Sequence, residues 1–196
     1  MRKRNPWVPI SDLLSSVVLV LLLMFVMASI IPKYTQEAQR QQMMTQIDQA
    51  LKDYQDDGLL NININNGILE FTSMTFSSGS AVVKPETVKV IKELADKLKS
   101  YMDDNATMEI LIEGHTDPEV VSAVRNQGGY FSNNIQLSTL RAANVREELL
   151  KYMGTQYSQR IGVAGYGETR LKNTAEPLSA ENRRIELRIL WNGKKD

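Results

Sequence analysis

The sequence predicts an α+β fold: one domain carried behind a single N-terminal transmembrane helix and a helical stalk. Three observations predict it. Residues 13–31 contain no charged side chain, residues 34–55 have the composition of a helix, and strand-like and helix-like patterns alternate from Leu59 onward. A chain of 196 residues is long enough for one ordinary domain with appendages.

Composition excludes several classes of function. The 23 basic and 23 acidic residues cancel, which argues against a nucleic-acid partner recognised through global positive charge. The chain has no cysteine and only one histidine, which excludes disulfides, thiol nucleophiles and metal centres built from several Cys or His ligands. We therefore expect no resident metal and no cofactor.

Residues 6–31 are predicted to form a retained membrane span. A helix of 19 uncharged residues is roughly 28 Å long, close to the hydrocarbon thickness of a bilayer. A signal peptide is the alternative, but Ile30, Ile31 and Pro32 make a poor cleavage site. Three basic residues lie in the tail 1–5, so the positive-inside rule predicts a cytoplasmic N-terminus and a periplasmic domain on a bacterial inner membrane.

Asp12, at the start of the apolar run, has two interpretations. It is either the N-cap of a helix that begins beside it, or an intramembrane carboxylate in a helix that begins at Pro6. In the second case it lies roughly 9 Å along the helix axis, where a carboxylate indicates an ion pathway that partner helices must complete. Three small hydroxyl residues would belong to that pathway: Ser11, Ser15 and Ser16.

Residues 32–58 are expected to form the helical stalk. Between Pro32 and Gly58 the segment has no proline or glycine, and its apolar residues recur every three or four positions. They form a narrow stripe: Met43, Met44, Ile47, Ala50, Leu51 and Tyr54. The stripe is either the seam of a dimeric coiled coil or part of a fraying stalk, and the sequence favours neither.

Residues 59–192 are expected to form the domain, followed by a short tail, 193–196. The turn Asn65-Asn66-Gly67 between apolar runs predicts a hairpin. Helices are predicted from Pro85 and from about Ser138, by apolar residues at helical spacing. Three further strands are predicted around residues 108–113, 161–163 and 185–189. The order of elements predicts a sandwich with helices on one face of a sheet.

Four motifs resemble those of the OmpA-like peptidoglycan-binding domain. They are Gly114-His115-Thr116-Asp117, Asn134 to Val145 with its Leu137-Ser138 and Arg141-Ala142 pairs, Gly165-Tyr166-Gly167-Glu168, and Asn182-Arg183-Arg184-Ile185-Glu186. The resemblance covers residues 68–190 and implies an OmpA-like β/α sandwich. Two departures are an unusually long separation between Asp117 and Leu137, which resembles the MotB-like branch, and Leu171 where many members carry proline.

The resemblance implies a site for the diaminopimelate of a peptidoglycan stem peptide. Asp117 would bind its ammonium, and Arg141 would bind its carboxylate, because a planar guanidinium binds carboxylate bidentately. Four further residues would line the pocket: Thr116, Asn134, Leu137 and Arg184. The alternative for Asp117 and Arg141 is a structural ion pair, and His115 is expected to be a structural support. We expect no catalytic residue and no enzymatic activity, because no nucleophile–base pair is visible.

The whole architecture resembles the wall-anchored stator subunits of ion-driven motors, namely the flagellar MotB-like subunits and the ZorB-like subunits of the Zorya anti-phage system. The resemblance implies a homodimer inside a multi-span MotA- or ZorA-like subunit, expected as a pentameric ring. Asp12 would carry a proton by default, or a sodium ion. The short N-terminal tail favours the anti-phage motor over the flagellar one. A passive tether between inner membrane and cell wall is the remaining alternative.

Overall fold

The computed structural model describes residues 7–77, 79–119, 121, 124–126 and 129–191. The predicted tails 1–5 and 193–196, and the predicted helix start at Pro6, lie outside these residues. The chain divides into two compact units, Met1–Arg40 and Gln41–Asp196, and each is described by itself.

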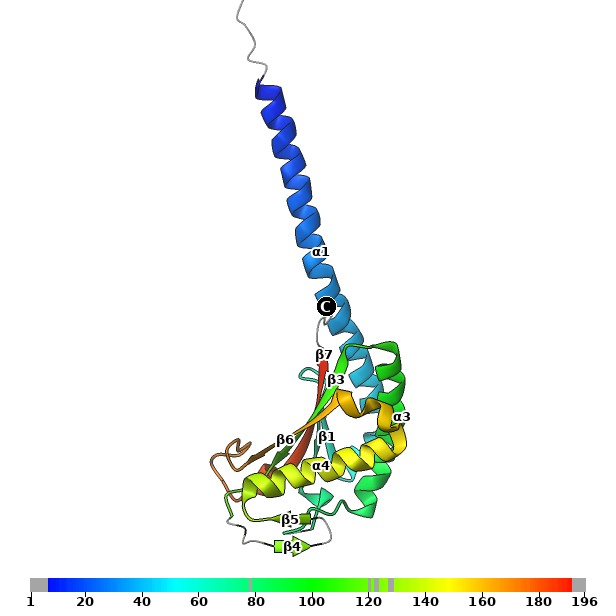
Figure 1. Cartoon of the computed structure of the whole chain (residues 1–196), viewed down its shortest axis with the longest axis vertical. Helices are drawn as coiled ribbons and strands as arrows, with labels where there is room; N and C mark the ends of the chain where they lie inside the picture. Colours follow the sequence, from blue (N-terminus) through cyan, green and yellow to red (C-terminus); the bar gives the residue numbers. More distant parts are fainter. Residues whose placement is uncertain (1–6, 78, 120, 122–123, 127–128, 192–196) are drawn as a thin grey trace, which may run out of the picture. The chain divides into compact units, whose positions relative to one another are not determined.

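The first unit contains most of helix α1, Trp7–Ala50 (Figure 1). Its side chains from Ile10 to Ile31 are exposed, and its most apolar stretch has a mean hydropathy of 2.8, so it is long and apolar enough to cross a membrane. Asp12 lies in the second turn of α1, five residues after Trp7. The N-cap interpretation of Asp12 is therefore wrong, because a cap stands at the helix end.

The second unit begins inside α1 rather than at Leu59. Met43, Met44 and Ile47 at the end of α1, and Leu51 before α2 (Lys52–Asp56), are fully buried in the domain core. The structure thus corrects the expectation that residues 41–58 belong to a separate stalk. Their apolar stripe packs into the core of their own domain, which includes residues of α3. Helical periodicity shows which face is covered but not what covers it.

The second unit is built on a five-stranded sheet of order β1-β2-β7-β3-β6. The strands are β1 (Leu60–Asn63), β2 (Ile68–Phe71), β3 (Met108–His115), β6 (Ile161–Gly167) and β7 (Arg184–Trp191). Strands β3 and β6 are parallel, and the other neighbours are antiparallel. The predicted hairpin is confirmed as β1–β2, and Gly67 has a φ of 64°, which a residue with a side chain rarely adopts.

Helices α3 (Pro85–Asp104) and α4 (Asn134–Met153) complete the core, and Figure 1 shows α4 crossing the sheet. Their buried apolar side chains form one cluster with those of the sheet and the end of α1, which confirms the α+β fold class. Helix α4 begins four residues earlier than expected. Its N-cap is Asn133, whose side-chain oxygen accepts a 2.9 Å hydrogen bond from the Gln136 N–H.

The long segment between β3 and α4 contains a small hairpin that the sequence did not predict. Strands β4 (Val124–Asn126) and β5 (Gly129–Phe131) pair antiparallel to each other. The Phe131 side chain is fully buried in a second apolar cluster with Ala81 and Leu137. This cluster attaches the hairpin to the first turn of α4.

Two motif glycines let α4 lie directly against the sheet. A Cβ atom added at Gly114 of β3 would lie 2.0 Å from the carbonyl oxygen of Ser138, and one at Gly165 of β6 would lie 2.0 Å from Thr139 Oγ1. The close approach lets Ser138 Oγ accept a 2.9 Å hydrogen bond from the Gly167 N–H. The ends of β3 and β6 are thereby held against the first turns of α4.

Candidate functional site

The motif-bearing ends of these elements surround a cavity of about 280 Å³. It is lined by Ser73, Phe76, Ser77, His115, Glu119, Arg141, Arg183 and Arg184. The 3-10 helix η1 (Ser73–Thr75), the end of β3, helix α4 and the start of β7 all contribute. Three of the four sequence motifs therefore meet at one place, although they lie far apart in the chain.

Arg141 supplies a buried guanidinium to this cavity. The residue is 6% exposed, its Nε donates a 2.9 Å hydrogen bond to the Ser80 carbonyl, and its guanidinium lies 5.0 Å from the centre of the Phe76 ring. Burial lowers the pKa of Arg141 to about 10, against the opposing effect of Asp117, so the group stays charged at neutral pH. In the part of the chain that the structure describes, no carboxylate forms an ion pair with it. Arg141 is therefore available to bind an anion.

Asp117 is bound to a different arginine from the one expected. Its Oδ2 accepts a 2.5 Å hydrogen bond from Arg183 Nη1, and its Oδ1 accepts a 3.3 Å hydrogen bond from the Glu119 N–H. The alternative of a structural Asp117–Arg141 ion pair is wrong. Sequence reasoning chose Arg184 and missed Arg183, although two adjacent arginines at the start of β7 were a signal that one could face the end of β3.

The other expected pocket residues separate into two groups. Arg184 lines the cavity, and its Nε donates a 2.8 Å hydrogen bond to Glu186. Asn134 lies behind the cavity, where its Nδ2 donates to the main-chain oxygens of Asp117 at 3.3 Å and Glu119 at 3.0 Å. Two more expected residues are support rather than lining: Leu137 is buried in the Phe131 cluster, and Thr116 is buried with its N–H bonded to the Gly167 carbonyl.

The predicted ion-pathway residues lie together on α1. Ser15 and Ser16 follow Asp12 by three and four positions, which places them on its face of the helix, and Ser11 precedes it. Ser11 Oγ donates to the Trp7 carbonyl at 2.9 Å, and Ser16 Oγ donates to the Leu13 carbonyl at 2.8 Å. These hydroxyls bond to their own helix, and Asp12 is exposed on its surface.

Comparison with known proteins decides the family. Residues 75–184, more than half of the chain, match the family model described as OmpA family. The chain belongs to the OmpA family. The close packing of α4 on Gly114 and Gly165 and the arginine-lined cavity are thus features of an OmpA-family domain.

Two sequence relatives define what the chain resembles. Motility protein B of Bacillus subtilis is 28% identical over 167 residues, which cover 82% of this chain and 60% of the relative. Outer membrane porin F of Pseudomonas aeruginosa is 33% identical over 114 residues, which cover 58% of this chain and 28% of the relative. The chain therefore spans less than two thirds of either relative. The match to motility protein B also exceeds what residues 75–184 can supply, so it includes sequence outside the OmpA-family region.

Solved structures show the same fold. A MotB-like protein from Desulfovibrio vulgaris superposes with a TM-score of 0.59 at 22% identity, covering 80% of this chain and 96% of that one. The cell wall anchor of the T6SS from Pseudomonas aeruginosa gives 0.60 at 21% identity, with 74% and 97% covered. The periplasmic domain of Helicobacter pylori MotB gives 0.54 at 19% identity, with 69% and 80% covered.

The face of the OmpA-family sheet opposite α4 carries a row of glutamates. Glu70, Glu186 and Glu113 lie opposite one another on β2, β7 and β3, an arrangement that is repulsive by itself. Basic side chains neutralise these glutamates through ion pairs. Lys172 pairs with Glu70 at 2.7 Å, and Arg184 pairs with Glu186 at 2.8 Å. Arg188 pairs with both Glu113, at 2.9 Å, and Glu186, at 3.1 Å. Glu113 is only 3% exposed.

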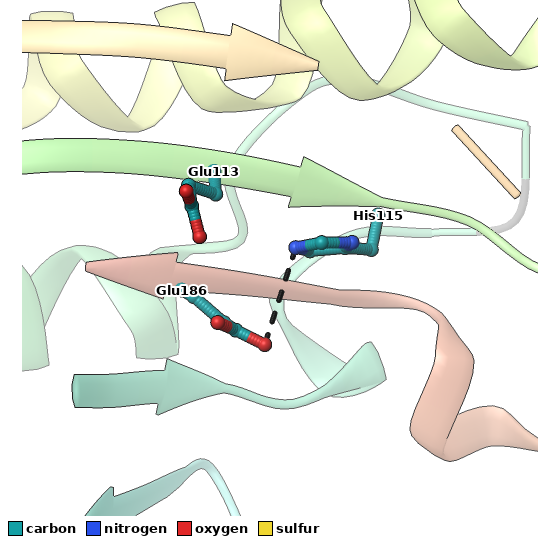
Figure 2. Close-up of side chains that lie close together, drawn as sticks. All are labelled: Glu113, His115 and Glu186. Atoms are coloured by element: carbon teal, nitrogen blue, oxygen red, sulfur yellow. Dashed lines mark ion pairs between the residues drawn. The ribbon is translucent and has the colours of Figure 1, made fainter. Parts of the chain in front are cut away.

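His115 lies beside this row (Figure 2). Its Nε2 is 3.9 Å from Glu186 Oε1, and its ring stacks on Tyr166 with 5.4 Å between ring centres. Possible metal-ligating atoms of Glu113, His115 and Glu186 lie within 4.8 Å of one another. A cation there would compete with Arg184 and Arg188 for both carboxylates, so we interpret the group as structural.

The charge state of His115 should make the stability of the domain depend on pH. Burial lowers its pKa to about 4, helped by Arg184, Arg170 and Arg188 and opposed by Glu186. The unfolded chain, with a histidine pKa of about 6.5, binds the proton first as pH falls. The stability contributed by neutral His115 is therefore complete above pH 6.5 and is lost between about pH 6.5 and 4, by about 3 kcal/mol in total.

The substitution His115→Phe tests this expectation, because it keeps a ring against Tyr166 and removes the titrating group. Both ring nitrogens of His115 lack hydrogen-bond partners among the described residues, so phenylalanine breaks no bond there. Urea unfolding of wild type and variant is compared at several pH values. The stability difference should shift in favour of the variant as pH falls from 7 to 4, whereas parallel profiles would contradict the assignment.

Proposed function

We propose that this chain is the peptidoglycan-anchored B subunit of an ion-driven inner-membrane motor of the MotB-like class. The domain would bind the stem peptide of peptidoglycan in the arginine-lined cavity, and the α1 helix would carry the ion on Asp12. The observation that carries the binding proposal is Arg141, a buried cation at a cavity that no described carboxylate neutralises.

The chemistry of diaminopimelate fits this site. Its carboxylate would take the free side of the Arg141 guanidinium, whose Nε is already fixed by the Ser80 carbonyl. Its ammonium would bind Asp117, which is close enough to Arg141 to oppose the lowering of the Arg141 pKa. A structural neighbour, the cell wall anchor of the T6SS from Pseudomonas aeruginosa, supports such a role. We propose binding without cleavage of the cell wall.

A conservative substitution of Arg141 tests wall binding. Arg141→Lys keeps the charge but loses the planar, bidentate donor, so binding to purified diaminopimelate-type sacculi should fall by roughly ten-fold or more in a co-sedimentation assay. The matched control is Arg146→Lys on the same helix, whose guanidinium bonds the Ile161 and Ser158 carbonyls outside the cavity. Equal binding by wild type and both folded variants would reject the proposed site.

The membrane part of the proposal rests on α1. Its long, predominantly apolar and exposed surface requires lipid or partner helices. The match to motility protein B extends beyond the OmpA-family region. We propose a homodimer held in a pentameric ring of a multi-span partner, with the N-terminus in the cytoplasm and the domain in the periplasm. The transported ion is a proton, with sodium as the alternative.

Such a motor has two candidate functions. We propose an anti-phage motor of the Zorya type, and the similarity to motility protein B makes a flagellar stator the second candidate. In both, the peptidoglycan-bound domain would hold the dimer still while the ring turns. The passive tether is the competing function, because it needs wall binding but no ion on Asp12.

A further inference from the structure

We propose that Arg183 is a built-in competitor for the ligand's ammonium, and that it selects stem peptides bearing a second carboxylate. This inference rests on the proposed function and specifies the ligand that the cavity accepts. Arg183 Nη1 donates a 2.5 Å hydrogen bond to Asp117 Oδ2. The ammonium of the ligand would have to bind this same carboxylate.

Of the three arginines that line the cavity, Arg183 is the one suited to leave its place. Its side chain is 39% exposed, and beyond Asp117 its Nη1 has only a long, 3.4 Å contact with the Leu178 carbonyl. By contrast, the Arg184 side chain is 7% exposed and bonded to Glu186, and Arg141 is buried against Phe76 and bonded to Ser80. Moving the Arg183 side chain into water therefore breaks one ion pair and one long hydrogen bond.

Charge balance then determines which ligands bind well. Asp117 is 5% exposed and is neutralised by Arg183 in the empty domain. When a ligand ammonium takes over Asp117, the Arg183 guanidinium is released at the edge of the cavity without an anion. A ligand that carries one ammonium and one carboxylate satisfies Asp117 and Arg141 but leaves Arg183 unpaired. A second carboxylate on the ligand would restore the lost pair.

Two stem tripeptides separate these cases. Both are N-acetylated and carry an amide at the C-terminal carboxyl, so that diaminopimelate offers one ammonium and one carboxylate; in one peptide the glutamyl carboxylate is free, and in the other it is amidated. The wild-type full chain in detergent should prefer the free form in calorimetric titrations. The substitution Arg183→Gln removes the competitor, so the variant should bind the amidated peptide roughly two- to five-fold more tightly than wild type does, and should lose most of the preference.

The control is Lys172→Gln, which removes a positive charge that is bound to Glu70 and not to Asp117. It should leave the preference between the two peptides unchanged. If Arg183→Gln weakens binding of the amidated peptide or leaves it unchanged, Arg183 is an ordinary contact and the inference is overturned. If wild type binds neither peptide, the proposed function itself fails, and the inference fails with it.

Discussion

Replacing Gly114 with alanine is expected to destabilise the OmpA-family domain by about 3 kcal/mol or more. The new Cβ would lie 2.0 Å from the Ser138 carbonyl oxygen and 2.7 Å from its carbonyl carbon. Both are backbone atoms of α4, so no rotamer change relieves the overlap, and the helix itself must move away from β3. That movement would loosen the buried α4 residues and the Ser138–Gly167 hydrogen bond together.

A second glycine of the same sheet provides the matched control. A Cβ atom at Gly162 of β6 would meet only Leu111 Cδ1, at 3.4 Å, which is ordinary contact with a flexible side chain. Gly162→Ala should change stability by no more than about 1 kcal/mol. Thermal unfolding of the detergent-solubilised chain, followed by near-ultraviolet circular dichroism, compares the two. A Gly114→Ala melting temperature equal to that of Gly162→Ala would show that α4 is not held as closely as described.

The substitution Asp12→Asn is expected to abolish motor activity while leaving the protein in the membrane. Asparagine keeps the size and hydrogen-bonding capacity of the side chain but cannot gain and lose a proton. Because Asp12 lies inside α1 and not at its end, helix capping no longer explains its presence. We expect at least a ten-fold loss of whichever phenotype the wild-type gene confers, scored in parallel as swimming in soft agar and as protection in phage plating.

The same experiment distinguishes motor from tether. Ser29→Ala is the control on the same helix, since its Oγ only donates to the Phe25 carbonyl at 2.8 Å. Each variant is checked for membrane abundance and for binding to sacculi, so that a loss of activity is not a loss of protein. If the Asp12→Asn variant has normal abundance and the full phenotype, ion transport on Asp12 is contradicted and wall attachment remains as the function.

The sheet and its hairpin could be predicted because their signals are local. Asn65-Asn66-Gly67 demands a tight turn, and the alternating residues of β3 and β7 show one apolar face. The surface against which residues 41–51 pack could not be predicted in the same way. Their stripe gives the direction of a buried face, and identifying the surface that covers it requires the folded domain.

In the candidate site too, features with local sequence signals could be predicted, and features that depend on the folded domain could not. Three of the four motifs led to the correct ends of β3, α4 and β7, because each motif is short and contiguous in sequence. The partner of Asp117 was missed because it depends on which of two adjacent arginines turns toward β3 where β7 begins. The burial of Glu113 could not be predicted either, because it comes from Arg188 and the neighbouring strands, which lie far from Glu113 in the sequence.

The position of β7 has a consequence for how the protein is made. This strand is the last strand of the sheet in chain order, yet it lies between β2 and β3. It carries three of the charged residues that neutralise one another across the sheet: Arg184, Glu186 and Arg188. A nascent chain released before residue 184 would have the β1–β2 hairpin and the β3–β6 pair without the strand that hydrogen-bonds to both. Folding of the domain must therefore wait until β7 has been synthesised, and the emerging polypeptide needs protection from proteases and premature association until then.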